Sequence, residues 1–480
     1  MSRSYELPPG LDTASRLKTG AFYTPPHIVD FMVSMLLEGK NAPLRICDFS
    51  CGAGAFLAGV LRWVKGKFPA DHTRWCQNLY GMDINPEALK LARRNLPDIP
   101  EENFICTDTL NDSQHTFDLI IGNPPYRCGG LRNRDAFPAE KQRQLKAAFP
   151  MGFEYKMNLF ALFTEQASRK SSEFALIVPD TILCGRYFSK LRRYLAEEFH
   201  LKALCILEQP GFDAAMGSAV ILHVSCTSAP LSARKTLCRR FGRGEELSLA
   251  GAYETAQSRF PAESRCRFQL ANSPEHERIM AKIFSGSRPL GELFTFASGI
   301  IARRGKESIV TRTPGDDTRP GIVYGREVMP FEIHSEGFYI RIAPEKIKSG
   351  LNHERFTNKK IFLRQTGSTL VAAVSDAPLY ALNNCHVGSA SGDFPLETLA
   401  ALLNSTLLKC VFHYLSGENN REFAQIDIDL LKELPLRRTP AFDRFARQCA
   451  KDPAARQELD ERCAKLYGLT PEEMKILAEQ

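Results

Sequence analysis

The residues best suited to chemistry in this sequence are the consecutive Asn123-Pro124-Pro125-Tyr126. Two adjacent prolines fix φ twice and remove two backbone donors, so the segment is a stiff turn that presents carbonyl oxygens. An aromatic NH2 is a poor nucleophile, because its lone pair is delocalised into the ring. The side-chain carbonyl of Asn123 and the main-chain carbonyl of Pro124 can accept both amino hydrogens, while Tyr126 offers a flat face. The segment therefore suits methylation of an exocyclic amine; the alternative is a proline-stiffened strand end with an incidental asparagine.

A glycine-containing loop, DFSCGAGAF at residues 48–56, predicts a nucleoside site. Gly52 and Gly54 allow a tight turn in which a ligand can approach the main chain. The next strand-like run ends at Asp83, at the sheet edge where an adenosine ribose is held in open α/β sheets. Leu57 replaces the third glycine of the dinucleotide fingerprint, which favours S-adenosylmethionine over NAD. An ordinary strand–helix turn with two glycines is the alternative.

The elements that must position these residues alternate between apolar runs and helical patterns from residue 44 to about residue 227. This alternation predicts an α/β fold, a seven-stranded, mostly parallel Rossmann-like sheet with helices on both faces. Thr24 is expected to cap a further helix that begins at Pro25. The expected strands are residues 44–50, 78–84, 103–108, 117–122, 173–179, 201–207 and 218–224, and the expected helices are 55–66, 86–96 and 188–199.

The second half of the chain has a different pattern, and 480 residues are too many for one ordinary domain. A polar, basic stretch around residues 228–274 marks the expected junction. Short strand-like runs and a helical pattern at residues 396–415 then predict an α+β domain. The expected division is residues 1–235, 236–435 and a helical tail at 436–480.

Composition narrows the class of protein. Hydrophobic residues make up 44% and charged residues 24%, as in globular proteins, and no apolar run approaches the ~18 residues of a membrane helix. The N-terminus has no signal-peptide core and the 14 cysteines form no C-x-x-C pair, so we expect a cytoplasmic protein with reduced thiols. A net charge of +7 permits a polyanionic partner without requiring one. The basic clusters at 234–243 and 303–306 are either solvated loops or anion contacts.

Together these motifs resemble those of S-adenosylmethionine-dependent amino-methyltransferases. The catalytic string, the 48–56 loop and Asp83 look like that family's motifs, and TGAFYTPP at residues 19–26 resembles its methionine-binding motif. The order of motifs, with a recognition domain after them, is similar to the gamma class of DNA adenine-N6 methyltransferases, the TaqI-like group. The resemblance is clear over roughly residues 17–227. Phe49 and Ser50 depart from it, because the family commonly has proline and alanine there.

The resemblance implies a site-specific DNA methyltransferase that moves a methyl group from S-adenosylmethionine to N6 of a flipped-out adenine in duplex DNA. The setting would be a restriction-modification or related defence system, with a separate restriction endonuclease as an open further partner. Residues 1–235 would form the cofactor-binding catalytic domain and residues 236–435 the DNA target-recognition domain. We expect Arg303 and Arg304 to lie at the DNA surface.

The resemblance also assigns roles to single residues, with no metal ligand among them. Thr24 would contact the methionine carboxylate, Asp83 the ribose and Asp108 the adenine of the cofactor. Asp108 instead suits a helix cap and Phe212 a core position, and we expect Cys51 to pack rather than react. The implied catalytic residues are Asn123, Pro124, Pro125, Tyr126 and Phe212, the last stacking on the target base. The implied cofactor-binding residues are Thr24, Asp48, Ser50, Cys51, Gly52, Gly54, Asp83, Asp108 and Asn123.

Three other functions stay open. A methyltransferase acting on a protein glutamine faces the same nucleophilicity problem, but such enzymes carry a helical domain ahead of the catalytic one. An RNA adenine methyltransferase is disfavoured by the same order of domains, in which the second domain follows the catalytic one. A DNA-binding specificity subunit with an inactive core is disfavoured by the intact string at residues 123–126.

Overall fold

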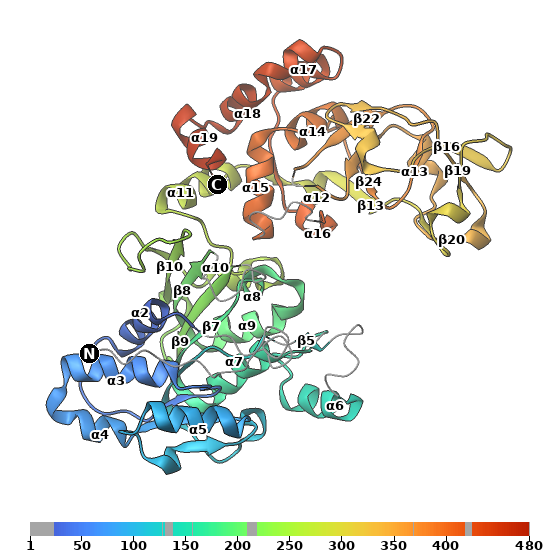
Figure 1. Ribbon diagram of the computed structural model, residues 1–480. Coiled ribbons are helices and arrows are strands. Elements are labelled where there is room, and N and C mark those ends of the chain that lie inside the picture. Colours follow the sequence, from blue (N-terminus) through green and yellow to red (C-terminus); the bar gives the residue numbers. More distant parts are fainter. Residues whose placement is uncertain are drawn as a thin grey trace. The chain divides into compact units, whose positions relative to one another are not determined.

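The computed structural model describes residues 24–126, 128–129, 138–155, 157–208, 218–367, 369–417 and 425–479. The chain divides into two compact units between Gln269 and Leu270 (Figure 1). Within the described residues no single helix is long and apolar enough to cross a membrane. Helices α14 (Leu396–Leu403) and α15 (Thr406–Ser416) pass that test only as a pair, which is bent by 71°.

A mostly parallel sheet forms the centre of the first unit, which confirms the expected α/β fold (Figure 1). All seven expected runs form strands, two more strands extend the sheet, and β9 and β11 run antiparallel to the rest. In order across the sheet, the nine described strands are β11 (Tyr253–Ala256), β10 (Lys235–Phe241), β8 (His200–Leu207), β9 (Ala219–Ser225), β7 (Ser171–Pro179), β4 (Phe117–Gly122), β1 (Ile46–Asp48), β2 (Leu79–Asp83) and β3 (Phe104–Cys106).

Both faces of this sheet are buried. In β4, Leu119 and Ile121 pack into one core with α2 (Pro26–Leu37) and α3 (Ala55–Lys67), whereas Ile120 is buried on the opposite face. Burial on both faces explains why the strands are continuous apolar runs in the sequence. The unit's other described helices are α4 (His72–Cys76), α5 (Pro86–Asn95), α6 (Ala139–Ala148), α7 (Leu159–Lys170), α8 (Thr181–Cys184), α9 (Ser189–Glu198) and α10 (Arg259–Ala262).

The sheet continues past residue 235, where a domain boundary was expected. β10 begins there, pairs in parallel with β8, and buries Thr236 and Cys238 completely. Arginines interrupt the apolar pattern of this strand, so its sequence resembles a polar junction. Arg240 pairs with Glu208 at 3.2 Å and Arg239 pairs with Glu245, so this part of the basic cluster is neutralised within the unit.

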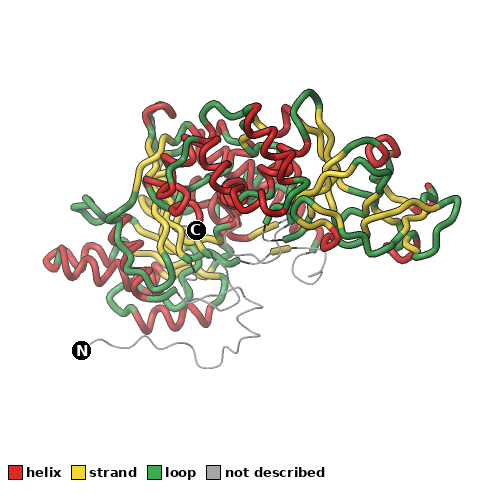
Figure 2. The backbone as a smooth tube through the Cα atoms, turned by 90° about the horizontal axis from the view of Figure 1, so that it is seen from above, coloured by secondary structure: helices red, strands yellow, loops and turns green. Residues whose placement is uncertain are grey.

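The second unit is α+β, as expected. Its first sheet contains β13 (Phe294–Ser298), β24 (Cys385–Ala390), β21 (Lys360–Arg364) and β22 (Ala372–Ser375), and its second contains β15 (Val310–Thr311), β19 (Tyr339–Arg341), β16 (Thr318–Ile322) and β23 (Tyr380–Ala381). Figure 2 shows this strand-rich part at the right, with loops between short strands. The expected helix at residues 396–415 is two helices, because Ser405 caps α15 with its hydroxyl.

The expected separate tail at residues 436–480 is part of this unit. Side chains of α17 (Pro440–Cys449), α18 (Leu459–Tyr467) and α19 (Pro471–Ala478) share one hydrophobic core with α11 (Pro274–Phe284), α14 and α15. Each of these helices has an apolar stripe that must be covered, and the others cover it.

Candidate functional site

Four neighbouring parallel strands bring the sequence-predicted residues to one edge of the first sheet. Asn123 follows β4, the glycine loop follows β1, Asp83 ends β2, and Asp108 follows β3 shortly after its end. Since the carboxyl ends of parallel strands meet at the same edge, residues separated by up to 75 positions in sequence converge here.

The glycine loop leaves its main chain open on one side. Gly52 has φ +53° and Gly54 has φ +89°, a conformation that side-chain-bearing residues rarely adopt. A Cβ added to Gly52 would meet no atom within 4 Å, whereas one added to Gly54 would lie 2.5 Å from Leu96. The space beside Gly52 can therefore admit a ligand to the backbone. Cys51 is buried and burial raises the pKa of its thiol, so it packs here as an unreactive thiol.

Two carboxylates lie beneath this loop. Asp83 accepts hydrogen bonds from the backbone N–H of Gly52 at 2.9 Å and of Asn85 at 2.8 Å. Asp48 is only 2% exposed; its burial raises its pKa to about 8, against a lowering by the backbone N–H of Ser50 and with a further rise from Asp83. Among the described residues, neither carboxylate forms an ion pair with a lysine, arginine or histidine. The pair therefore favours a cationic ligand.

Asn123 has a buried acceptor without a donor. Its Nδ2 donates to Thr24 Oγ1 at 3.1 Å, and its main-chain oxygen accepts from Ser50 Oγ at 3.1 Å. Its Oδ1 is buried and has no hydrogen-bond partner among the residues that the structure describes. Leaving a buried acceptor unpaired costs about 1–3 kcal/mol, which a ligand N–H would recover.

The Tyr126 ring is fixed at both ends. Its hydroxyl donates to the Ile177 carbonyl of β7 at 2.9 Å, and its ring meets Phe160 of α7 edge-on, with centroids 6.2 Å apart. Burial raises the pKa of Tyr126, so the hydroxyl stays protonated and keeps donating. The Tyr126 ring, three residues after Asn123, is therefore held in one orientation.

Three expected roles have different outcomes. Thr24 does not cap α2, because Pro25 is the residue before the helix and no side chain caps it; its hydroxyl receives Asn123 instead. Asp108 caps a short 3₁₀ turn through the Leu110 N–H at 3.2 Å and pairs with Lys141 of α6 at 3.1 Å. Phe212 lies outside the described residues.

Ile84 is a candidate that the sequence interpretation missed. It directly follows Asp83 and is 70% exposed, although it ends an apolar run that looks like buried strand. A large exposed apolar side chain beside the proposed ribose carboxylate offers a surface for a flat base. In the sequence, the feature that could have identified Ile84 is its position immediately after the carboxylate that ends the strand.

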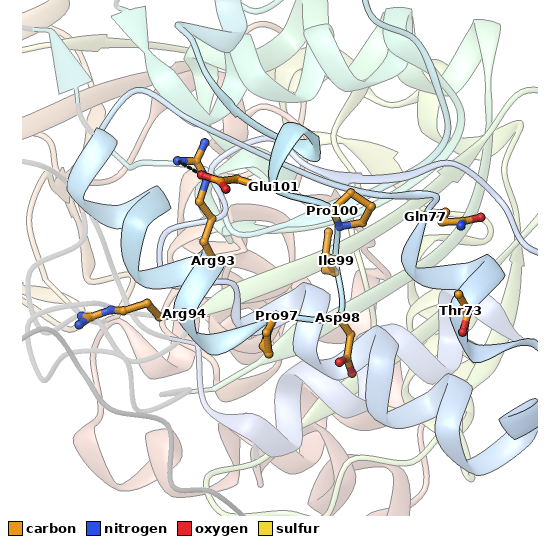
Figure 3. A pocket seen from close by; sticks show the side chains of 9 residues that line it. All are labelled: Thr73, Gln77, Arg93, Arg94, Pro97, Asp98, Ile99, Pro100 and Glu101. Carbon is orange, nitrogen blue, oxygen red and sulfur yellow. Dashed lines mark ion pairs between the residues drawn. The ribbon is translucent and has the colours of Figure 1, made fainter.

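A separate pocket of about 520 Å³ lies at the opposite edge of the sheet (Figure 3). Its lining includes Gln77, just before β2, and Glu101, just before β3, so it faces the amino ends of these strands. Arg93 and Glu101 pair in this pocket at 3.4 Å. None of the sequence-predicted residues lines it.

Comparisons with known proteins match both halves of the chain. Residues 11–225 match the N-6 DNA Methylase family, and residues 321–436 match the TaqI-like C-terminal specificity domain. The "Type II methyltransferase M.TthHB8I" of Thermus thermophilus is 30% identical over 226 residues, which are 45% of this chain and 47% of that protein. The "Release factor glutamine methyltransferase" of Lactococcus lactis is 30% identical over 103 residues, 21% of this chain and 34% of that protein.

A solved structure shares the fold over most of the chain. It is the nuclease-deletion mutant of the Type ISP restriction-modification enzyme LlaGI with a DNA substrate mimic, with a TM-score of 0.54 and 14% identity, covering 90% of this chain and 54% of that one. This chain spans about half, or less, of the length of the curated relatives given above. The expected cofactor, S-adenosylmethionine, agrees with the match to the N-6 DNA Methylase family. The first part of the chain thus matches the N-6 DNA Methylase family and the second part the TaqI-like C-terminal specificity domain, which confirms the resemblance to TaqI-like DNA N6 methyltransferases.

Proposed function

We propose that this protein transfers a methyl group from S-adenosylmethionine to N6 of adenine at specific sites in duplex DNA, in a restriction-modification setting. The observation that carries the proposal is the buried, unpaired Oδ1 of Asn123 beside the fixed ring of Tyr126. An acceptor next to an aromatic face suits an aromatic amine, which is flat and donates hydrogen bonds in its ring plane.

Each residue at this edge has a role in the proposed reaction. Oδ1 of Asn123 and the carbonyl of Pro124 accept the two amino hydrogens, and this draws the nitrogen lone pair away from the ring. Pro125 fixes the backbone just after the Pro124 carbonyl and so stiffens the turn. The bound cofactor supplies an electrophilic methyl group. No side chain needs a pKa near neutrality for this step, since positioning prepares the nucleophile.

The residues that would hold the cofactor fit its charge and shape. Asp48 and Asp83 are acidic groups without a cation partner among the described residues, and the sulfonium of the cofactor is a cation that would favour their ionised forms. The open side of Gly52 admits a ligand to the main chain, and Asp83 has oxygens to accept from ribose hydroxyls. Asp108 is proposed to contact the cofactor's adenine, in exchange for its present partner Lys141.

An adenine within a duplex must leave the helix to reach this edge, at a cost of a few kcal/mol. Stacking on an aromatic ring recovers about 1–3 kcal/mol per base, and Tyr126 is proposed to supply it together with Phe212. These two rings would hold the base while Asn123 engages its amino group.

Contacts to the DNA backbone are proposed for a basic pair of strands in the second unit, β14 (Ile301–Ala302) and β20 (Ile347–Ser349). The Arg303 N–H donates to the Lys346 carbonyl at 2.8 Å, so Arg303 and Arg304 lie beside Lys346 and Lys348. Among the described residues, no carboxylate pairs with any of these four cations. Unneutralised cations gathered on one strand pair suit a row of phosphates.

The test supplies methyl-labelled cofactor to the purified protein with unmethylated duplex DNA, total RNA or a cell-protein extract in separate reactions. The expected result is label in DNA that digests to the N6-methyladenine nucleoside. Label in protein or RNA would overturn the DNA assignment. The reaction with cell protein is the more important control of the two, because part of the chain is similar to a glutamine methyltransferase.

Asn123→Ala is the matching variant. It should lower transfer about 10²-fold or more, as removal of one preorganised polar group does elsewhere, while cofactor affinity changes little. Asn78→Ala, at the opposite edge where the amide bonds the Arg74 carbonyl, serves as the control and should transfer normally. Joint loss of transfer and cofactor binding in Asn123→Ala would show that the residue is structural.

A further inference from the structure

Two hydroxyl groups from outside the catalytic turn hold Asn123. Thr24 precedes α2 and is 3% exposed; its Oγ1 accepts from Asn123 Nδ2 across 99 positions of sequence. Ser50, in the glycine loop, donates to the main-chain oxygen of the same asparagine, 73 positions away. The amide nitrogen and the backbone of Asn123 are thus each fixed, while Oδ1 alone is left without a partner.

The two ends of a side-chain amide have nearly the same shape and opposite polarity. If the Asn123 amide turned by half a rotation, its NH2 would face the substrate's amino group, and two donors would then oppose each other. Every other contact would barely change in shape, so packing alone cannot choose between these orientations. On one side of the amide the Thr24 hydroxyl oxygen accepts from Nδ2, and this contact leaves Oδ1 on the other side.

We propose that Thr24 is a positioning residue whose hydroxyl oxygen receives Nδ2 of Asn123 and thereby directs the amide oxygen toward the substrate's amino group. Ser50 donates to the main-chain oxygen of Asn123, so the cofactor loop and the catalytic turn keep a fixed position relative to each other. This inference rests on the proposed methyl transfer and adds a residue to it that touches neither amine nor methyl group.

Thr24→Val is the decisive variant, because valine keeps the volume and removes the acceptor. It should lower kcat about 10-fold to 100-fold, whereas Thr24→Ser should restore most of kcat. Thr236→Val is the matched control, since Thr236 is fully buried in β10 of the same unit and its hydroxyl has no partner. The control should be active and should unfold at the same temperature as the parent.

A double-mutant cycle separates orientation from other roles. Asn123→Ala removes the amide that Thr24 holds, so in that background Thr24→Val should change the residual kcat less than about 3-fold. An equal loss in both backgrounds would overturn the proposal. So would an unchanged kcat in Thr24→Val, or a loss confined to cofactor affinity, which would make Thr24 a cofactor contact instead.

A measurement that needs no catalysis tests this inference independently of the proposed function. With asparagine-selective ¹⁵N labelling, the side-chain NH2 signal of Asn123, identified by its absence in Asn123→Asp, should shift in Thr24→Val and stay in place in Thr24→Ser. An unmoved signal in Thr24→Val would overturn the contact. Absence of methyl transfer to DNA by the parent protein, with this shift present, would overturn the proposed function alone.

Discussion

Asp48 is a buried carboxyl group whose protonation state depends on what lies beside it. Burial and the nearby charge of Asp83 raise its pKa to about 8, although the Ser50 N–H lowers it. At neutral pH most of the ligand-free protein therefore carries a proton on Asp48. A cationic cofactor bound at this edge would lower that pKa again, because it stabilises the carboxylate.

Cofactor binding is accordingly predicted to release a proton from Asp48. Affinity for S-adenosylmethionine should rise between pH 6 and pH 8, by at most about tenfold per pH unit, because only the ionised form attracts the cation. Calorimetric titrations in two buffers of different ionisation enthalpy measure the released proton. Asp48→Asn should bind with a smaller pH dependence, and an unchanged dependence in that variant would assign the proton elsewhere.

The Asp48 carboxyl group should also make stability depend on pH. Cofactor affinity should rise with pH, whereas the free energy of unfolding should fall. The pKa of Asp48 in the folded protein lies above the value of about 3.9 in an unfolded chain, so its stabilising effect is complete below about pH 4. That effect is lost as pH rises through about 8, and the free energy of unfolding of the ligand-free protein should fall over this range. Urea unfolding at pH 6 and pH 8.5 measures this fall, which Asp48→Asn should reduce.

At the scale of elements, the end of β4 has to pass very close to β1. Cys47 of β1 pairs with Ile120 of β4, and two residues later Gly122 lies against the Asp48 side chain. A Cβ on Gly122 would be 2.7 Å from Asp48 Oδ1, which is closer than real Cβ contacts come. Glycine at this strand end therefore makes room for the buried carboxylate.

Gly122→Ala is predicted to destabilise the first unit by about 1–3 kcal/mol, because overpacking forces Asp48 or the strand to move. Cofactor affinity should fall with it, since Asp48 belongs to the same edge. Gly66→Ala in α3 is the control: nothing lies within 4 Å of its added Cβ, and alanine favours a helix. Equal stability of both variants in urea unfolding would contradict the predicted clash.

At the scale of the whole molecule, contacts to the DNA backbone are proposed for the unit that follows Gln269. The two basic clusters of the sequence differ in their surroundings, although both look alike in composition. Arg239 and Arg240 are paired with glutamates in the first unit, whereas Arg303 and Arg304 have no carboxylate partner among the described residues. Arg303 and Arg304 are therefore better placed to meet phosphates than Arg239 and Arg240.

Reversing Arg303 and Arg304 together to glutamate should weaken DNA binding at moderate salt and reduce the salt dependence by about one phosphate contact for each arginine. Affinity for S-adenosylmethionine should stay unchanged. The control reverses Arg278 and Arg462, which carry the same charge in the same unit but pair with Glu275 and Glu458 on their own or adjoining helices. Equal DNA affinity of the two double variants would contradict the assignment.

Local signals determined much of this protein. Apolar runs predicted the seven strands β1, β2, β3, β4, β7, β8 and β9, and the need for positive φ marked Gly52 and Gly54 as a turn. The prolines after Asn123 marked a stiff turn by their own geometry. These inferences need only a few neighbouring residues, because periodicity and backbone conformation are local properties.

Tertiary structure decided the partners. It placed Thr24 against Asn123, left Asn123 Oδ1 without a donor, and put Ile84 at the surface although it ends an apolar run. It also turned the arginine-rich β10 into a strand of the first sheet. Such outcomes depend on which strands become neighbours and where their ends meet, and a hydrogen bond between residues 99 positions apart leaves no periodic trace in the sequence.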